Sequence, residues 1–360
     1  MLTDSDAAVR LFVLRRMQRE KIPTRVASLA AWLRDETDGE RLTAILDSLH
    51  EHPADMTCES LEFAITDVRK NATARLAAFA QWTAGLTEPR ESWLVTLAKS
   101  LEDGPILTSV LREFGKRMSD ASDQPTVSSA VGALLISKTN AKETEVRVGA
   151  IGTLVTLRIT DGAGPVPGLL QDTDARVRRA AAFAAGQLEV RATIPALLNL
   201  VRDADVAVRQ ASLDALRQLR EPRVVPLAVA ALSDAATQLS ALRCLAELGG
   251  PEHASAVIEI AARNSSTEVL SLTIEMLTKW TTREGLDAAR RADLQRAVMR
   301  TALTRSCWRT SRIPNQKRSC RRLFPCMAAV GWAGIRKMVR RSRSSNGRAS
   351  ASFRRRSTIA

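Results

Sequence analysis

The chain has 360 residues, enough for two or three globular domains or for one extended repeat array. Aromatic residues make up 4% of it and tyrosine is absent, which favours an all-α protein over a β-sandwich. Of the 53 Lys and Arg residues 16 lie from position 301 on, and none of the 39 Asp and Glu residues does. Residues 1–300 therefore carry a net charge of −2, and the total of +14 is no argument for nucleic-acid binding by the whole chain.

Cysteine usage and the N-terminus point to a reduced compartment. The five cysteines are an odd number and include no Cys-x-x-Cys pair, so neither a disulfide framework nor a zinc motif is indicated. The first six residues are acidic, whereas a signal peptide would be basic. No apolar run reaches the length of a membrane span. We expect a cytoplasmic protein without a membrane span.

Residues 1–140 show a weak helical period. The segment from Asp4 to Arg10 already has an acid followed by Val-Arg, so the chain starts in mid-pattern, which suggests an unusual cap or a fragment of a longer protein. From residue 21 to residue 138, apolar residues at spacings of three and four alternate with proline-containing breaks. We predict about three divergent helix pairs here.

Residues 141–300 contain a repeat of about 31 residues. Three lines, Glu143 to Ile151, Asp174 to Ala182 and Asp205 to Leu213, each start 31 residues after the one before. This period is typical of a helical repeat array. Less regular copies follow, and we predict a last amphipathic helix over residues 283–299.

Each repeat has a second apolar block that begins with proline. The blocks are Val166-Pro167, Ile194-Pro195 and Val225-Pro226, and proline at the first turn marks the start of a helix. The predicted fold is an all-α, right-handed α-solenoid of antiparallel helix pairs. We expect the side chains of Leu198 and Leu213 to face the core, and the proline-started helices to line the concave face.

An acid and an arginine lie four residues apart at four predicted helix starts. The acid can cap the helix, and the arginine on the same face can pair with it or with the acid of the next turn. Two interpretations stay open: a structural ladder along one edge, or a row that binds the phosphates or carboxylates of a ligand. The arginines are Arg10, Arg147, Arg178 and Arg209.

Residues 301–360 form an Arg/Ser-rich tail. It has no acidic residue, so its arginines cannot pack into a core without outside partners. It is either a disordered arm that binds nucleic acid or an anionic surface, or sequence read out of frame. The candidate nucleic-acid contacts are Arg340, Arg341, Arg343, Arg354, Arg355 and Arg356.

The central lines resemble HEAT-type repeats, in particular the short HEAT-like units of phycobilisome lyases. Asp174-Ala-Arg-Val-Arg-Arg-Ala-Ala followed by Ile194-Pro-Ala-Leu-Leu carries the resemblance. It covers residues 142–280 well and implies an α-solenoid that binds partners, with no particular activity. Such blocks also resemble the middle part of large multidomain bacterial proteins. A haem motif found in some of those is missing here.

Enzymes built on such arrays find little support in the sequence. The HEAT-like deoxyhypusine hydroxylases hold iron with several His-Glu pairs, and this chain has one, at His50-Glu51. HEAT-like DNA glycosylases use a tryptophan in their groove. This chain has tryptophans too, but none lies in a motif that matches those enzymes, and amphipathic helices bury tryptophan routinely. We expect a non-enzymatic scaffold without cofactor or metal that binds a protein partner. Nucleic-acid binding through the basic tail and a groove arginine row is the alternative.

Overall fold

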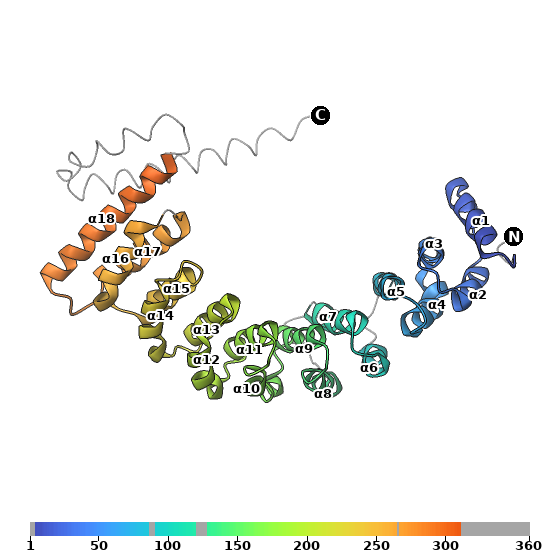
Figure 1. Ribbon diagram of the computed structural model, residues 1–360, viewed down its shortest axis with the longest axis horizontal. Helices are drawn as coiled ribbons and strands as arrows, with labels where there is room; N and C mark the ends of the chain where they lie inside the picture. Colours follow the sequence, from blue (N-terminus) through green and yellow to red (C-terminus); the bar gives the residue numbers. More distant parts are fainter. Residues whose placement is uncertain (1–3, 86–90, 120–127, 265, 311–360) are drawn as a thin grey trace. The chain divides into compact units, whose positions relative to one another are not determined.

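The computed structural model describes residues 4–85, 91–119, 128–264 and 266–310, and all regular structure in these ranges is helical (Figure 1). This confirms the predicted all-α fold. The α-helices are α1 (Ala7–Glu20), α2 (Val26–Asp35), α3 (Gly39–His50), α4 (Ala54–Thr66), α5 (Ala72–Ala84), α6 (Glu91–Ser100), α7 (Pro105–Ser119), α8 (Ser129–Lys138), α9 (Thr144–Thr156), α10 (Val166–Leu169), α11 (Ala175–Gln187), α12 (Ile194–Leu200), α13 (Val206–Gln218), α14 (Val225–Ala231), α15 (Gln238–Leu248), α16 (Ala254–Arg263), α17 (Thr267–Thr281) and α18 (Ala288–Thr310).

The chain divides into two units. Unit 1 ends at His253 and is a stack of helix pairs in two layers. The odd-numbered helices α1 to α15 pack each on the next in one layer, and the even-numbered helices form the other. In unit 2, which begins at Ala254, the helices α16, α17 and α18 pack on one another.

The 31-residue pattern sets the length of the odd helices in the central repeats. Asp174 and Asp205 cap α11 and α13 by accepting backbone N–H groups of the first turn. Each helix ends at a leucine followed by a residue in the left-handed conformation: Arg158, Glu189 and Arg220 have φ of 50°, 53° and 54°. The next N–H then bonds to the carbonyl oxygen five residues before it, as in Val190 N to Ala185 O at 2.9 Å. This turn directs the chain into the proline-started even helix.

Small residues let the odd helices approach closely. A Cβ on Gly186 of α11 would lie 3.0 Å from Cα of Ala215 on α13, so only glycine fits there. In the continuous stretch from α9 to α15, the odd helices lie on the inner side of the bend (Figure 1). The expectation that the proline-started helices line the concave face is therefore wrong for this stretch, because the closely spaced layer is the inner one.

Burial agrees with most of the predicted core. Val177, Ala181 and Ala184 of α11 are buried, and Leu213 is fully buried. Leu198, in contrast, is only half-buried, and its neighbour Leu197 takes the core position. The reason is helical geometry, since Leu197 lies three residues after the buried Ile194 and shares its face.

The last described helix differs from the prediction at both ends. Residues 282–287 form a turn, with Gly285 at a φ of 79°, and the Asp287 carboxylate accepts the N–H of Arg290 at 2.7 Å. The acid and the glycine delay the start from residue 283 to Ala288. The helix α18 then continues to Thr310, beyond the change of composition at residue 301.

The difference between the two leucines can be measured. We expect Leu213→Ala to lower the free energy of unfolding by roughly 2 to 5 kcal/mol, because it leaves a cavity in the fully buried layer contact. Leu198→Ala should cost below about 2 kcal/mol, since part of that side chain is already in water. Urea unfolding of both variants checks this. Equal losses would show that the assignment of the inward face is wrong.

Candidate functional site: the arginine–aspartate ladder

Each arginine of the central repeats first binds the loop that precedes its own helix. Nη1 of Arg178 donates to the carbonyl oxygens of Asp172 and Thr173, both at 3.0 Å. Arg147 and Arg209 do the same to the carbonyls five and six residues before them, at 2.7 to 3.0 Å. The guanidinium thereby fixes the turn that enters the odd helix.

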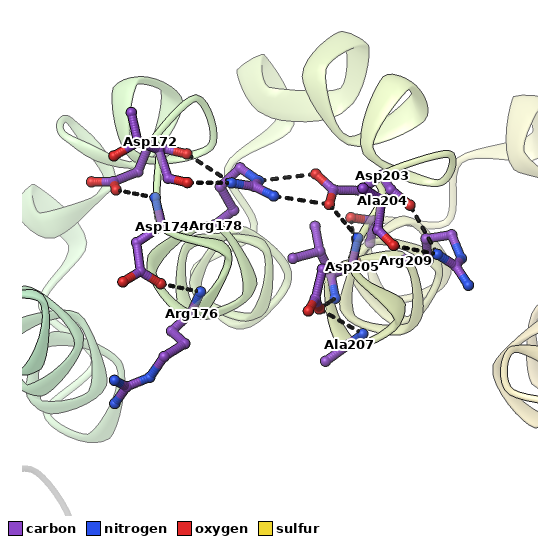
Figure 2. A network of polar contacts seen from close by, with 12 residues as sticks. Asp172, Asp174, Arg176, Arg178, Asp203, Ala204, Asp205, Ala207 and Arg209 are labelled. Atoms are coloured by element: carbon purple, nitrogen blue, oxygen red, sulfur yellow. Dashed lines mark hydrogen bonds and ion pairs between the residues drawn. The ribbon is translucent and has the colours of Figure 1, made fainter.

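The same arginine then binds an aspartate 25 residues further on, in the loop of the next repeat. Nε and Nη2 of Arg178 donate to the two carboxylate oxygens of Asp203, both at 2.9 Å (Figure 2). Arg147 pairs with Asp172 at 3.1 Å and Arg209 with Asp234 at 2.8 Å. The arginines therefore do not pair with the acid four residues before them. Two of these acids, Asp174 and Asp205, cap their helices instead, whereas the side chain of Glu143 makes no cap hydrogen bond.

The aspartates join the links into a continuous ladder. The carboxylate of Asp203 binds Arg178 of the preceding repeat and also accepts the N–H of Asp205 at 2.8 Å. Its carbonyl oxygen accepts from Arg209 of its own repeat at 2.9 Å. Asp172 is used in the same way, between Arg147 and Arg178. Asp172 and Asp203 thus each connect two successive arginines, and these loops are held at fixed spacing.

The ladder lowers the pKa of its carboxyl groups. The bidentate hydrogen bond from Arg178 holds the pKa of Asp203 below its usual range, and the bond from Arg209 does so for Asp234. The pKa of Asp174 is lowered chiefly by the backbone N–H of Arg176 that it caps. Side chains of Arg178 and Asp203 are 17% and 8% exposed, so water screens this pair only weakly.

Arg10 has half of this arrangement. It donates to the carbonyl oxygens of Asp4 and Ser5, as the central arginines do in their own loops. In place of an aspartate it lies over the ring of Trp32, with 5.0 Å between the guanidinium carbon and the ring centroid. Asp6 caps α1 through the N–H of Ala8 at 2.8 Å.

In the N-terminal half, different residues connect successive loops. Nζ of Lys70 donates to the carbonyl oxygen of Glu36 at 3.0 Å, and the buried Arg75 bonds the carboxylate of Glu102. The backbone N–H of Lys142 donates to Asp103 at 3.0 Å. Their spacings do not repeat, so no periodic signal in the sequence reveals them.

Among the described residues of this half, Glu36 is the most buried acid. Burial alone would raise its pKa, but hydrogen bonds from the N–H of Asp38, from Arg41 and from Trp32 bring the pKa down to about 2. The Nε1 of Trp32 and the Nε of Arg41 both lie 2.9 Å from its carboxylate. The group is a charged junction of three elements, α2, α3 and the loop between them.

The other sequence candidates are placed as follows. The six tail arginines predicted to contact nucleic acid lie outside the described residues. His50 is exposed near the end of α3, and Nε2 of His52 lies 2.9 Å from the hydroxyl of Thr24. Within the described ranges, no three His, Cys, Asp or Glu side chains are grouped to hold a metal ion. None of the described helices is long and apolar enough to cross a membrane.

Comparisons with known proteins agree with the repeat. The family described as HEAT repeats matches residues 162–239. No curated protein matches the chain.

Three solved structures are similar to it. YibA from Escherichia coli has 17% identity and a TM-score of 0.45 over 74% of this chain and 98% of that one. The CpcE–CpcF complex of phycocyanin lyase from Nostoc sp. PCC7120 has 16% identity and a TM-score of 0.34, over 77% and 95%. The Pds5–Scc1 complex has 11% identity and a TM-score of 0.40, over 85% and 65%.

The link between Arg178 and Asp203 can be tested by a double-mutant cycle. Arg178→Ala should cost about 2 kcal/mol of unfolding free energy, because it removes two hydrogen bonds from a mostly buried carboxylate, which keeps the N–H of Asp205, and leaves two loop carbonyls without this donor. Asp203→Asn should cost much less in that background than in the wild type, with a coupling of roughly 1 to 3 kcal/mol. The neighbouring exposed Arg179→Ala is the control and should change stability by less than about 0.5 kcal/mol. Purely additive effects would contradict the link.

Acid should weaken the ladder. The pKa values of Asp203 and Asp234 are lower in the folded state than in the unfolded chain, so their contribution is complete above the unfolded pKa of about 3.9. It is lost as the pH falls through the folded pKa. We expect the Tm to decrease from about pH 5 to pH 3, and the decrease to be smaller in Asp203→Asn. A variant that follows the wild-type profile would refute the assignment.

Proposed function

We propose that this chain, a HEAT-like repeat protein, is a non-catalytic scaffold that binds a protein partner on the surface of its odd-numbered helices. The observation that carries the proposal is Phe183 on α11, whose side chain is 51% exposed. It lies on the inner layer of the repeats, on a stripe with Arg176, Arg179 and Gln187, which are all exposed. Phenylalanine and arginine together are typical of the centre of protein interfaces.

The surroundings of Phe183 favour an approaching side chain. The equivalent positions one repeat before and after are Gly152 on α9 and Asp214 on α13. A Cβ on Gly152 would meet no atom within 4 Å, so the surface is open on that side. On the other side Asp214 forms an ion pair with Arg217 and accepts a hydrogen bond from the hydroxyl of Ser240. The phenylalanine is thus the apolar centre of a surface with a polar border.

We further propose that the ladder arginines brace the repeats and do not bind a ligand. Arg178 uses Nε, Nη1 and Nη2 in bonds to its own protein, and its side chain is 17% exposed. An anion would have to displace Asp203 or two loop carbonyls. Binding of an anion would break hydrogen bonds within the protein while forming new ones to the ligand, so the arginine row is a poor anion site.

Site-specific photocrosslinking tests the proposed surface. A photoreactive amino acid placed at Phe183 should capture a protein in an extract of the cells that make this chain, whereas one at Asn199, exposed on the even helix α12, should not. Phe183→Ala should keep the wild-type Tm, because the side chain is half in water, and should lower recovery of that partner at least tenfold. Equal capture from both positions, or none from 183, would contradict the proposal.

A further inference from the structure

A second surface feature lies in the even layer of unit 1. A groove of about 440 Å³ runs between α4 and α6 and reaches α2. Each of the two helices contributes one stripe at helical spacing, and the lining residues include Glu59, Glu62, Phe63 and Thr66 from α4 and Trp93 and Leu97 from α6. The helix α2 packs on α4 and α6 packs on α8, so the groove is where the even layer opens.

The aromatic walls of the groove are held in place from behind. Trp93 stacks on Trp82 of α5, with 4.0 Å between ring centroids and 27° between planes. Nε1 of Trp82 donates to the carboxylate of Glu62 at 3.1 Å. Phe63 has the buried ammonium of Lys70 5.6 Å from its ring centroid, and its side chain is 37% exposed. A ligand would therefore contact aromatic side chains that lose little conformational freedom on binding.

The charge in the groove is mostly negative. Glu59 and Glu62 lie on the α4 side, and Arg34 from α2 is the single basic residue of the lining. Glu59 is exposed and enters no ion pair or hydrogen bond among the residues that the structure describes. Its carboxylate lies one helical turn from the ring of Phe63, at positions i and i+4. A cation placed there would contact a carboxylate while its neighbouring apolar group contacts the ring.

We propose that this groove binds a segment of a partner protein that presents a large apolar side chain next to a Lys or Arg. The apolar side chain would lie against Phe63, Trp93 and Leu97, and the cation would pair with Glu59. The proposal does not depend on the surface around Phe183, which belongs to the other layer and is bordered by arginines. A basic partner segment fits the even groove on charge, and an acidic one does not.

Selection from a random peptide library tests this. Displayed 12-residue peptides are selected on the full-length chain, and synthetic copies of the enriched ones are measured by fluorescence anisotropy. We expect enriched peptides to combine a large apolar residue with Lys or Arg, and to bind Phe63→Ala and Glu59→Lys at least tenfold more weakly. Both positions are partly exposed, so the variants should stay folded, and thermal unfolding of each variant checks this.

Charge reversal and a control in the other layer give the decisive comparison. Selection on Glu59→Lys should enrich acidic peptides in place of basic ones, and Phe183→Ala should bind the original peptides as the wild type does. The proposal is overturned if no peptide is enriched on the wild type relative to Phe63→Ala. It is equally overturned if the enriched peptides carry no basic residue or bind Glu59→Lys unchanged.

Discussion

Unit 1 depends on the bonds that connect one inter-helix loop to the next. A repeat array has no single core that closes on itself, so each repeat must be fixed to its neighbour by local contacts. Burial of apolar stripes supplies the attraction between helices but allows sliding along them. The guanidinium of Arg178, held at once by two loop carbonyls and by Asp203 of the next repeat, removes that freedom. The same bond recurs from Arg147 to Asp234. It holds successive loops at a distance that permits the close contact between Gly186 and Ala215.

Much of the architecture could be predicted from the 31-residue period, and the partners of the charged residues could not. Spacing along one helix suggests an ion pair between Asp174 and Arg178, because those side chains share a face. In the structure the acid caps the helix and the arginine reaches Asp203, and that choice depends on where the next loop lies in space. Likewise only one residue of the pair Leu197-Leu198 lies in the core. The residue at which α12 begins determines that it is Leu197.

The N-terminal half was harder to predict for a related reason. Its loops are connected by Lys70, Arg75 and Asp103, which occupy unrelated positions in their repeats. The even-layer groove shows the same limit. Phe63 and Trp93 come from different helices, and a sequence pattern that identifies each as part of an apolar stripe does not show that the stripes face a common opening. The two proposed surfaces thus differ in chemistry, with arginines around Phe183 and carboxylates around Phe63.

The constant offset of the ladder also bears on how such a protein can change its length. If the segment from Arg178 to Val208 were lost, Arg209 would follow Val177 and would find the carbonyl of Asp172 six residues before it, where it now finds that of Asp203. Its forward partner, Asp234, would be unchanged. The ladder bonds of the arginine at the junction would thus be matched, and the same holds for the insertion of an additional copy. Unequal recombination can therefore alter the number of repeats without creating an unpaired buried charge in the ladder.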